Sequence, residues 1–253
     1  MQVTFYCLLA QSSLLDNFDR ATPAGKIVIG ILIVFSMFAW SVMTSKAFQM
    51  RRARRLNTLF RAEYLRQRSV VEIHSRRVNV DGCPLFSIYE DGCAELVQRL
   101  QSSSPTVDPS SAIEGRELSL KSMELVKGAL ERSVARESLR LEAGLILLAI
   151  AVSGAPFLGL LGTVWGVMDA FAAVAAGVTG AATLQMMAPG VAGALITTVA
   201  GLMVAIPSMF GYNWLVHTLR VLTVEMDNFA QEVAARMEVE FLEEHGPAEE
   251  PRP

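Results

Sequence analysis

The chain has 253 residues, of which 52% are hydrophobic and 19% are charged, and its formal net charge is −3. The mean hydropathy of +0.37 is typical of a membrane protein of ordinary size and argues against a soluble enzyme. The small net charge excludes little by itself, because the charged residues are unevenly distributed along the chain.

The first 45 residues contain an N-terminal segment (1–26) and a first predicted membrane span. The apolar start, Met1–Leu15, lacks a basic region and a small-residue cleavage site, which favours an interfacial helix over a signal peptide. Residues 27–44 form an uncharged run of 18 residues, which is long enough to cross a bilayer. We therefore predict a first membrane helix over 27–45.

Basic residues follow this helix closely. Residues 46–77 contain ten Lys or Arg side chains against two Glu. Because positively charged segments beside membrane helices stay in the cytoplasm, we predict that the N-terminus lies outside the cytoplasm and the C-terminus inside it. Basic clusters can also bind nucleic acid or anionic lipid. Contact with membrane lipid fits as a by-product, and we expect no nucleic-acid binding.

Residues 46–142 are predicted to form a cytoplasmic, mainly helical insertion that extends the first two membrane helices. The two stretches 48–68 and 112–140 are rich in helix-forming residues. The intervening 101–111 is a loop by composition, and Ser110 or Ser111 could cap the second helix. Apolar residues three or four positions apart predict one buried face on that helix: Met123, Val126, Leu130, Val134 and Leu141.

Between Ala143 and Leu219 the chain has one formally charged side chain, Asp169. This stretch of 77 residues is long enough to cross a bilayer twice. Gly and Thr residues in 175–185 weaken the helix there. We predict a hairpin of two membrane helices, 143–173 and 187–216, joined by a loop, 174–186, on the same outer side of the membrane as the N-terminus.

Small residues recur at helical spacing in both arms of this hairpin. They let helix backbones approach closely inside a membrane, so we expect the two arms to pack tightly against other helices. Pro156 and Pro207 are predicted helix kinks. The residues predicted to pack are Gly159, Gly162, Gly166, Gly190, Ala194 and Gly201.

The C-terminal segment, 217–253, carries nine acidic residues against three Arg. Its apolar residues Val221, Val224, Phe229, Val233 and Met237 predict that the third membrane helix continues as an amphipathic cytoplasmic helix. Residues 246–253 are expected to be disordered. Pairing between this acidic segment and the Arg-rich segment 46–77 is expected, within one chain or across subunits.

The sequence offers no candidate enzyme site. The three cysteines, Cys7, Cys83 and Cys93, have no metal-binding spacing, and the three histidines are scattered. No phosphate-binding loop or nucleophile motif is present in the sequence. We expect neither a catalytic activity nor a bound cofactor or metal.

Two stretches of the hairpin resemble a known family. Residues 155–171 (APFLGLLGTVWGVMDAF) are similar to the signature of the TolQ/ExbB/MotA family of bacterial inner-membrane ion-channel subunits. Residues 182–198 (ATLQMMAPGVAGALITT), continuing through 201–207 and Tyr212-Asn213, resemble the TolQ branch in particular. The resemblance implies an all-α fold with three membrane helices extended by cytoplasmic helices.

The resemblance also implies partners and a function. Five copies would surround a dimer of a TolR/ExbD-like single-pass protein, whose transmembrane aspartates carry the ion, with a proton as the expected ion. The output would be mechanical work on the cell envelope through a TolA- or TonB-like protein. The alternative is a passive pentameric scaffold that anchors envelope proteins without conducting ions.

Five residues form the ion pathway that this resemblance implies. Thr163 and Thr198 occupy the positions of the pore-facing threonines of the family. Taken singly, a membrane threonine often bonds only its own helix carbonyl. Where TolQ and ExbB members usually have a glutamate, this chain has Gly193, and Thr197 on the same helix face is a candidate replacement hydroxyl. Asp169 lies about 120° and about 9 Å from Thr163 along an ideal helix, which fits an outer vestibule better than the missing carboxylate.

Overall fold

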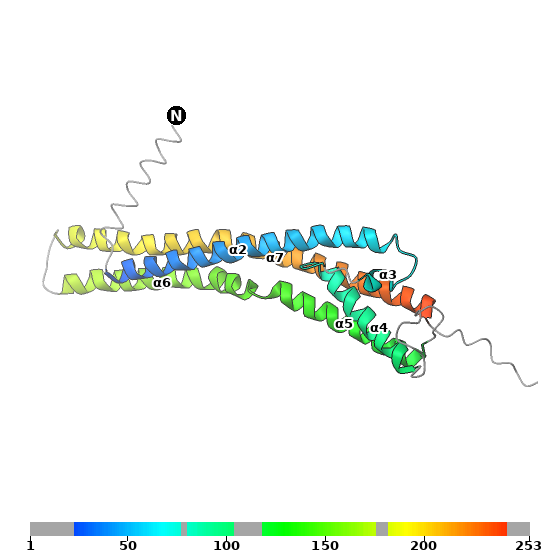
Figure 1. Ribbon diagram of the computed structural model, residues 1–253. Helices are drawn as coiled ribbons and strands as arrows, with labels where there is room; N and C mark the ends of the chain where they lie inside the picture. Colours follow the sequence, from blue (N-terminus) through cyan, green and yellow to red (C-terminus); the bar gives the residue numbers. More distant parts are fainter. Residues whose placement is uncertain (1–22, 77–79, 104–117, 176–181, 242–253) are drawn as a thin grey trace, which may run out of the picture. The chain divides into compact units, whose positions relative to one another are not determined.

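A computed structural model describes residues 23–76, 80–103, 118–175 and 182–241, and the structural statements below concern these residues (Figure 1). Long helices dominate the described part of the chain. The helices are α2 (Pro23–Tyr64), α3 (Glu72–Ser75), α4 (Pro84–Ser103), α5 (Leu120–Glu142), α6 (Leu145–Ala175) and α7 (Ala182–Phe241).

Three of these helices are long and apolar enough to cross a membrane. The candidate spans lie within Pro23–Tyr64, Leu145–Ala172 and Met187–Phe241. The prediction of an all-α membrane protein with three spans is therefore confirmed. Both α2 and α7 continue well beyond the length that a bilayer requires, because polar, helix-forming sequence follows the apolar run in each case.

The chain divides into two units, and α2 and α7 contribute to both. The membrane unit comprises 1–46 and 144–216, and the polar unit comprises 47–143 and 217–253. In the membrane unit, a buried cluster joins the three spans through Val28 and Leu32 of α2, Ala155 of α6 and Ala205 of α7.

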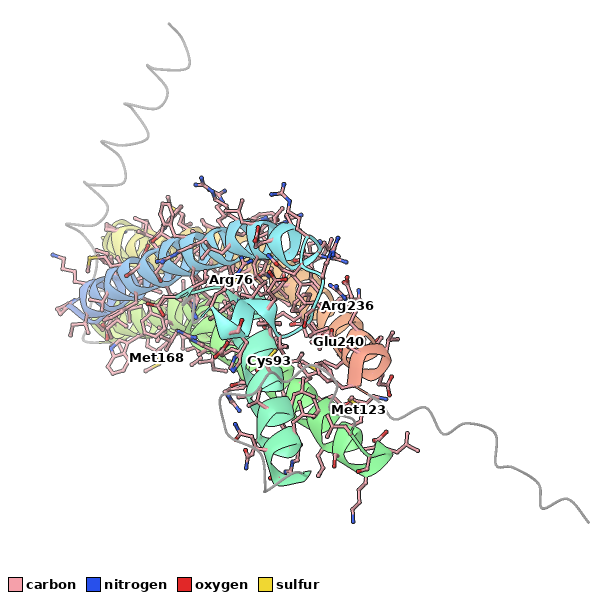
Figure 2. All side chains as sticks on the ribbon, turned by 45° about the vertical axis from the view of Figure 1, so that its right-hand side comes forward. Arg76, Cys93, Met123, Met168, Arg236 and Glu240 are labelled. Carbon is pink, nitrogen blue, oxygen red and sulfur yellow. The ribbon has the colours of Figure 1, made fainter. Side chains whose placement is uncertain are left out.

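Most large apolar side chains of the membrane unit point away from this cluster. Phe157, Met168 and Phe210 are each more than 60% exposed, and Met168 is marked in Figure 2. An isolated soluble protein rarely exposes so much apolar surface, whereas a membrane protein presents it to lipid or to other membrane helices.

In the polar unit, an aromatic cluster packs α2, α4 and α7 against one another. Five rings pack edge to face, with centroids 5.2 to 5.9 Å apart. Beside the cluster, α4 packs against α5, where the Asp91 carboxylate accepts hydrogen bonds from Ser133 and Arg136. The five rings are Phe60, Tyr64, Phe86, Tyr89 and Phe229.

The last turns of α7 hold the end of α2 and the turn that follows it. Arg236 donates to the carbonyls of Tyr64 and Gln67, and its guanidinium lies 4.8 Å from the centre of the Tyr64 ring. The Glu240 carboxylate accepts from the Val70 amide at 2.8 Å. Both side chains belong to the C-terminal part of α7 (Figure 2). They tie the end of α2 and the turn that follows it to α7.

The helix boundaries differ from the sequence predictions in several places. α2 ends at Tyr64, where Arg66 and Gln67 donate to carbonyls three residues back and tighten the last turn. α5 begins only at Leu120, because the Ser119 hydroxyl caps it by accepting from the Ser122 amide. Ser110 and Ser111, the predicted caps, lie outside the described residues. α4 extends through residues 101–103, the start of the predicted loop.

The second membrane helix is not a continuous extension of the polar helix before it. α5 ends at Glu142 and α6 begins at Leu145, with Gly144 at a φ of +91° between them. Only glycine adopts this left-handed conformation without a steric penalty, so Gly144 allows the chain to interrupt the helix here.

The buried faces of the polar helices follow from their periodicity. All five residues predicted to form the buried face of α5 are buried, so that prediction is confirmed. On α7, Phe229, Val233 and Met237 are buried as predicted, but Val221 and Val224 are exposed. The spacing of 3.6 residues instead continues the buried face through Leu222 and Met226. One expected acidic–basic pair forms within the chain, between Arg61 and Glu232 at 3.2 Å.

The remaining sequence predictions fall on segments that the structure does not describe. They are the interfacial helix of 1–15, residues 176–181 of the loop 174–186 and the disordered end 246–253. The described residues of that predicted loop are helical instead, because α6 extends to Ala175 and α7 begins at Ala182.

Candidate functional site

The contact between α6 and α7 lacks side-chain bulk. A Cβ atom at Gly159 would lie 2.8 Å from the carbonyl oxygen of Thr197, and one at Gly201 would lie 2.6 Å from the carbonyl oxygen of Ala155. Distances this short do not occur for real Cβ atoms, so any other residue would push the two backbones apart. Glycine at both positions therefore sets how closely the two helices approach.

The same contact continues toward the C-terminal end of α6 and the N-terminal end of α7. A Cβ at Gly162 would lie 2.5 Å from the Thr197 hydroxyl oxygen, and one at Gly166 would lie 2.7 Å from the Cβ of Ala194. A Cβ atom at Gly190 would lie 3.0 Å from the Cβ of Ala170. The structure thus brings together across one interface all six residues predicted to pack.

Hydroxyl groups gather around one backbone carbonyl in the middle of this contact. The carbonyl oxygen of Gly159 lies 3.0 Å from the Thr197 hydroxyl, 3.2 Å from that of Thr198 and 3.3 Å from that of Thr163. The hydroxyls of Thr163 and Thr198 lie 3.1 Å apart, so they also bond to each other. The two predicted pathway threonines therefore meet across the α6–α7 contact.

This arrangement gives the threonine hydroxyls more than one way to bond. A hydroxyl has one proton to donate and two lone pairs to accept with, and a carbonyl oxygen has two lone pairs. Thr163 also reaches the carbonyl of Leu160 at 2.7 Å, within its own helix. Thr163 and Thr198 are half-buried in the single chain, so they can exchange acceptors and bond to a water or to a carboxyl group that approaches.

Thr197 differs from its neighbour. Its side chain is completely buried, and its hydroxyl lies 2.7 Å from the carbonyl of Ala194 as well as 3.0 Å from that of Gly159. In the single chain this hydroxyl therefore bonds within the α6–α7 contact. Its predicted role as a replacement for a carboxyl group stays a prediction, and that role requires these bonds to be exchanged.

The other predicted pathway residues lie apart from the hydroxyl cluster. Gly193 is buried one turn before Thr197 on α7. Asp169 is half-buried on α6, six residues beyond Thr163, which is about 9 Å by helical rise. The predicted kink residues Pro156 and Pro207 lie inside the continuous helices α6 and α7. The structure does not bring Asp169 to the threonines.

Two features of this unit escaped sequence reasoning. The carbonyl of Gly159 is a backbone group, and no sequence signal indicates which carbonyl collects hydroxyls. Gly211 on α7 makes room for Met43 on α2, because a Cβ there would overlap the Met43 side chain. Gly211 follows Ser208 by three positions, so an extension of the small-residue pattern on α7 could have found it.

The fold and this site define a class of protein. It is a membrane protein with three candidate spans, two of which pack through glycines around a cluster of hydroxyls. The family model described as the MotA/TolQ/ExbB proton channel family matches residues 106–228. This match contains α5, α6 and the whole hydroxyl cluster.

Individual relatives extend the match over most of the chain. The Tol-Pal system protein TolQ of Haemophilus influenzae is 33% identical over 231 residues, which cover 89% of this chain and 93% of that protein. TolQ of Pseudomonas aeruginosa is 30% identical over 80% of this chain and 82% of its own length. The biopolymer transport protein ExbB of Xanthomonas campestris is 42% identical over 46% of this chain and 45% of its own length. The chain belongs to the MotA/TolQ/ExbB proton channel family.

Proposed function

We propose that this chain is the channel subunit of a bacterial inner-membrane motor that couples an ion gradient, of protons by expectation, to mechanical work on the cell envelope. The observation that carries the proposal is the hydroxyl cluster of Thr163 and Thr198 at the Gly159 carbonyl. Polar groups inside a membrane are costly and are usually retained for function. Membership of a proton channel family supports ion conduction as that function.

The proposed topology places the N-terminus in the periplasm and the C-terminus in the cytoplasm. It is supported by the ten basic side chains in residues 46–77, most of which lie on α2 beyond its apolar run. With three spans, the polar unit then lies in the cytoplasm.

The proposed channel depends on a carboxyl group from another protein. Gly193 leaves α7 without the glutamate that the family resemblance leads us to expect, and the charge of the hairpin is limited to Asp169. An aspartate on the single membrane helix of a TolR/ExbD-like partner would carry the ion past the threonine hydroxyls. Five copies of this chain around such a helix pair would cover part of the apolar surface that the membrane unit exposes in the single chain.

The energy available per ion sets the size of the mechanical step. One charge that crosses 100 mV releases about 2.3 kcal/mol, so a typical bacterial potential supplies on the order of 3–4 kcal/mol per ion. This is enough to break and remake a set of contacts between the ring and its core. A TolA- or TonB-like protein would receive the resulting force.

Proton flux into vesicles tests this proposal. The full chain is reconstituted with its co-expressed single-span partner, and wild type is compared with the double variant Thr163→Val and Thr198→Val. Valine keeps the shape of threonine but removes the hydroxyl. We expect the flux to fall about tenfold or more, equivalent to at least about 1.4 kcal/mol at the barrier.

The matched control is Thr44→Val on α2. The Thr44 hydroxyl bonds only to the Trp40 and Ser41 carbonyls of its own helix in the described structure, so its removal leaves the hydroxyl cluster intact. We expect unchanged flux. Full flux in the double variant would refute a path lined by Thr163 and Thr198.

A non-conducting scaffold is the second candidate function, and Gly193 favours it because the channel wall lacks a titratable group there. The same vesicles separate the two candidates. A wild-type complex that assembles with its partner but passes no protons under an applied potential would support the scaffold and end the channel proposal.

A further inference from the structure

A cavity in the polar unit has the chemistry of an anion site. Its volume is about 360 Å³, within the range of small-ligand pockets, and it lies between α2, the turn before α4 and the C-terminal end of α5. Two guanidinium groups and one carboxylate line it together with apolar side chains. The lining residues used below are Phe48, Arg52, Gly82, Glu137, Arg140 and Leu141.

The backbone and a carboxylate position the two arginines of this cavity. The Arg52 guanidinium donates to the carbonyl of Asp81 at 3.4 Å, and Gly82, at a φ of +85°, lies against that guanidinium. The Arg140 guanidinium lies 3.5 Å from the Glu137 carboxylate, which also accepts a hydrogen bond from Ser87. Both contacts are long, so most of the donors on each guanidinium stay available to a ligand.

The charge balance of the cavity favours an anion. Two permanent positive charges face one carboxylate, and that carboxylate is buried and already held by Ser87. A planar guanidinium binds the oxygens of a phosphate through two parallel hydrogen bonds. The cavity therefore fits a phosphate with one negative charge.

Two lining residues of the cavity follow the first apolar run closely along α2. Phe48 follows Thr44, the last residue of the first apolar run, by four positions, which is about 6 Å along α2. Arg52 follows by eight positions, or about 12 Å. The headgroup layer of a bilayer is about 5–8 Å thick on each side, and long arginine side chains reach back toward it. Leu141 lies four residues before α6 begins.

An exposed aromatic side chain, Phe48, also lines the cavity. The Phe48 side chain is 70% exposed, although it belongs to a helix that has just left its apolar run. An exposed aromatic side chain at this depth is typical of contact with the membrane interface. A soluble anion needs no such neighbour, whereas a lipid brings its glycerol and acyl carbons along with its phosphate.

We propose that this cavity binds the phosphate of an anionic phospholipid, with Arg52 and Arg140 on the phosphate and Phe48 beside the glycerol and upper acyl chain. The site goes beyond ion conduction, because it ties the polar unit to the membrane surface. It holds in either orientation of the chain, since it depends only on the depth of α2 in the bilayer.

Native mass spectrometry of the delipidated full chain in detergent tests the site. Phosphatidylglycerol and phosphatidylethanolamine are titrated separately, and the bound fraction is measured for wild type and for the double variant Arg52→Gln and Arg140→Gln. We expect wild type to prefer phosphatidylglycerol, and the double variant to bind it at least about tenfold more weakly, since hydrogen bonds to charged groups contribute at least about 1.5 kcal/mol each. Phosphatidylethanolamine carries the same phosphate, but its ammonium group compensates the charge, so its weaker binding should fall by a smaller factor in the double variant.

The matched control removes the same charge from the same two helices outside the cavity. It is the double variant Arg55→Gln and Arg132→Gln, whose side chains are exposed on α2 and α5. We expect this control to bind phosphatidylglycerol as wild type does. An equal loss in both double variants would mean a diffuse effect of surface charge and would overturn the proposal.

Two further arms keep the test decisive. The double variant Arg52→Lys and Arg140→Lys keeps both charges, so it should bind phosphatidylglycerol more tightly than the glutamine variant does. Binding no tighter than that of the glutamine variant would overturn the assignment. The lysine variant also replaces the glutamine variant in the comparison with wild type if the glutamine variant fails to fold. Inorganic phosphate is titrated in place of lipid. Phosphate that binds as tightly as phosphatidylglycerol would identify a site for a soluble anion and reject the lipid.

Discussion

The membrane unit and the polar unit achieve close packing in opposite ways. In the membrane unit, α6 and α7 meet where side chains are missing, at Gly159, Gly162 and Gly201. In the polar unit, helices meet where side chains are largest, around the rings of Phe60 and Phe229. The same helix, α7, takes part in both kinds of contact along its length.

The difference reflects the solvent around each unit. In water, burial of a large apolar ring is favourable because it removes apolar surface from the solvent. In lipid that gain is absent, because acyl chains are as apolar as leucine, so close backbone contact and internal hydrogen bonds must hold the helices. The exposed Phe157 and Phe210 and the buried Phe229 show the two rules in one chain.

Phe229→Ala should cause the largest loss of unfolding free energy. Its ring is 1% exposed and packs against Tyr64 at 5.2 Å, so truncation leaves a cavity in the polar unit and costs on the order of 3–5 kcal/mol of unfolding free energy. Chemical denaturation of the full chain in detergent, followed by tyrosine and tryptophan fluorescence, measures it. Phe210→Ala on the same helix, with 66% of the residue exposed, should cost far less. Equal losses would contradict the comparison.

Gly159→Ala should come next and should act on the membrane unit. The added methyl group meets the backbone of Thr197 at 2.8 Å, so the helices must separate at a cost of about 1–3 kcal/mol. Gly154→Ala on the same helix is the control, because a Cβ there has no neighbour within 4 Å among the described residues. Helix propensity makes that control neutral or slightly stabilising. Thermal stability in detergent distinguishes the two variants.

Two neighbouring tyrosines of the polar unit should respond differently to loss of the hydroxyl. The Tyr89 hydroxyl donates to the Val70 carbonyl and accepts from the His74 amide, so Tyr89→Phe should cost about 1–3 kcal/mol. The Tyr64 hydroxyl is buried with no partner among the described residues, so Tyr64→Phe should be neutral or stabilising. Urea unfolding at neutral pH measures both. A larger loss for Tyr64→Phe would show that its hydroxyl has a bonding role.

A rise to alkaline pH should cause the smallest loss of unfolding free energy. Burial raises the pKa of Tyr64 from 10.0 to about 12. Above pH 10 the unfolded chain releases this proton while the folded chain keeps it, so stability is lost as the pH rises from 10 to 12. By pH 11 the loss is about 1.4 kcal/mol. Unfolding of wild type and Tyr64→Phe from pH 8 to 11 measures it, and identical pH dependence would contradict the cause given.

Sequence periodicity predicted much of the fold, but not its interruptions. The three spans and the buried face of α5 follow from hydrophobic runs and from spacing, which the local sequence contains. The break at Gly144 could not be predicted, because a glycine inside a helix-forming stretch signals a turn only where the surroundings require a positive φ. The exposure of Val221 and Val224 likewise depends on which side of α7 faces its neighbours.

For the site, the sequence named Thr163 and Thr198 through a family resemblance, and it named the packing glycines through their spacing. It did not show that both hydroxyls reach the carbonyl of Gly159, nor that Thr197 is buried against that same carbonyl. Hydroxyl direction depends on the rotation and height of α7 against α6. Those quantities arise from contacts between residues almost forty positions apart.

The sequence alone therefore determined that this is a three-span helical membrane protein of a recognisable kind, because hydrophobicity and helical periodicity are properties of local stretches. Tertiary structure decided which carbonyl collects the hydroxyls, which arginines share a cavity of the polar unit and which face of α7 is buried. These depend on how distant helices approach, and close packing, in lipid as in water, is a property of pairs of surfaces rather than of either one.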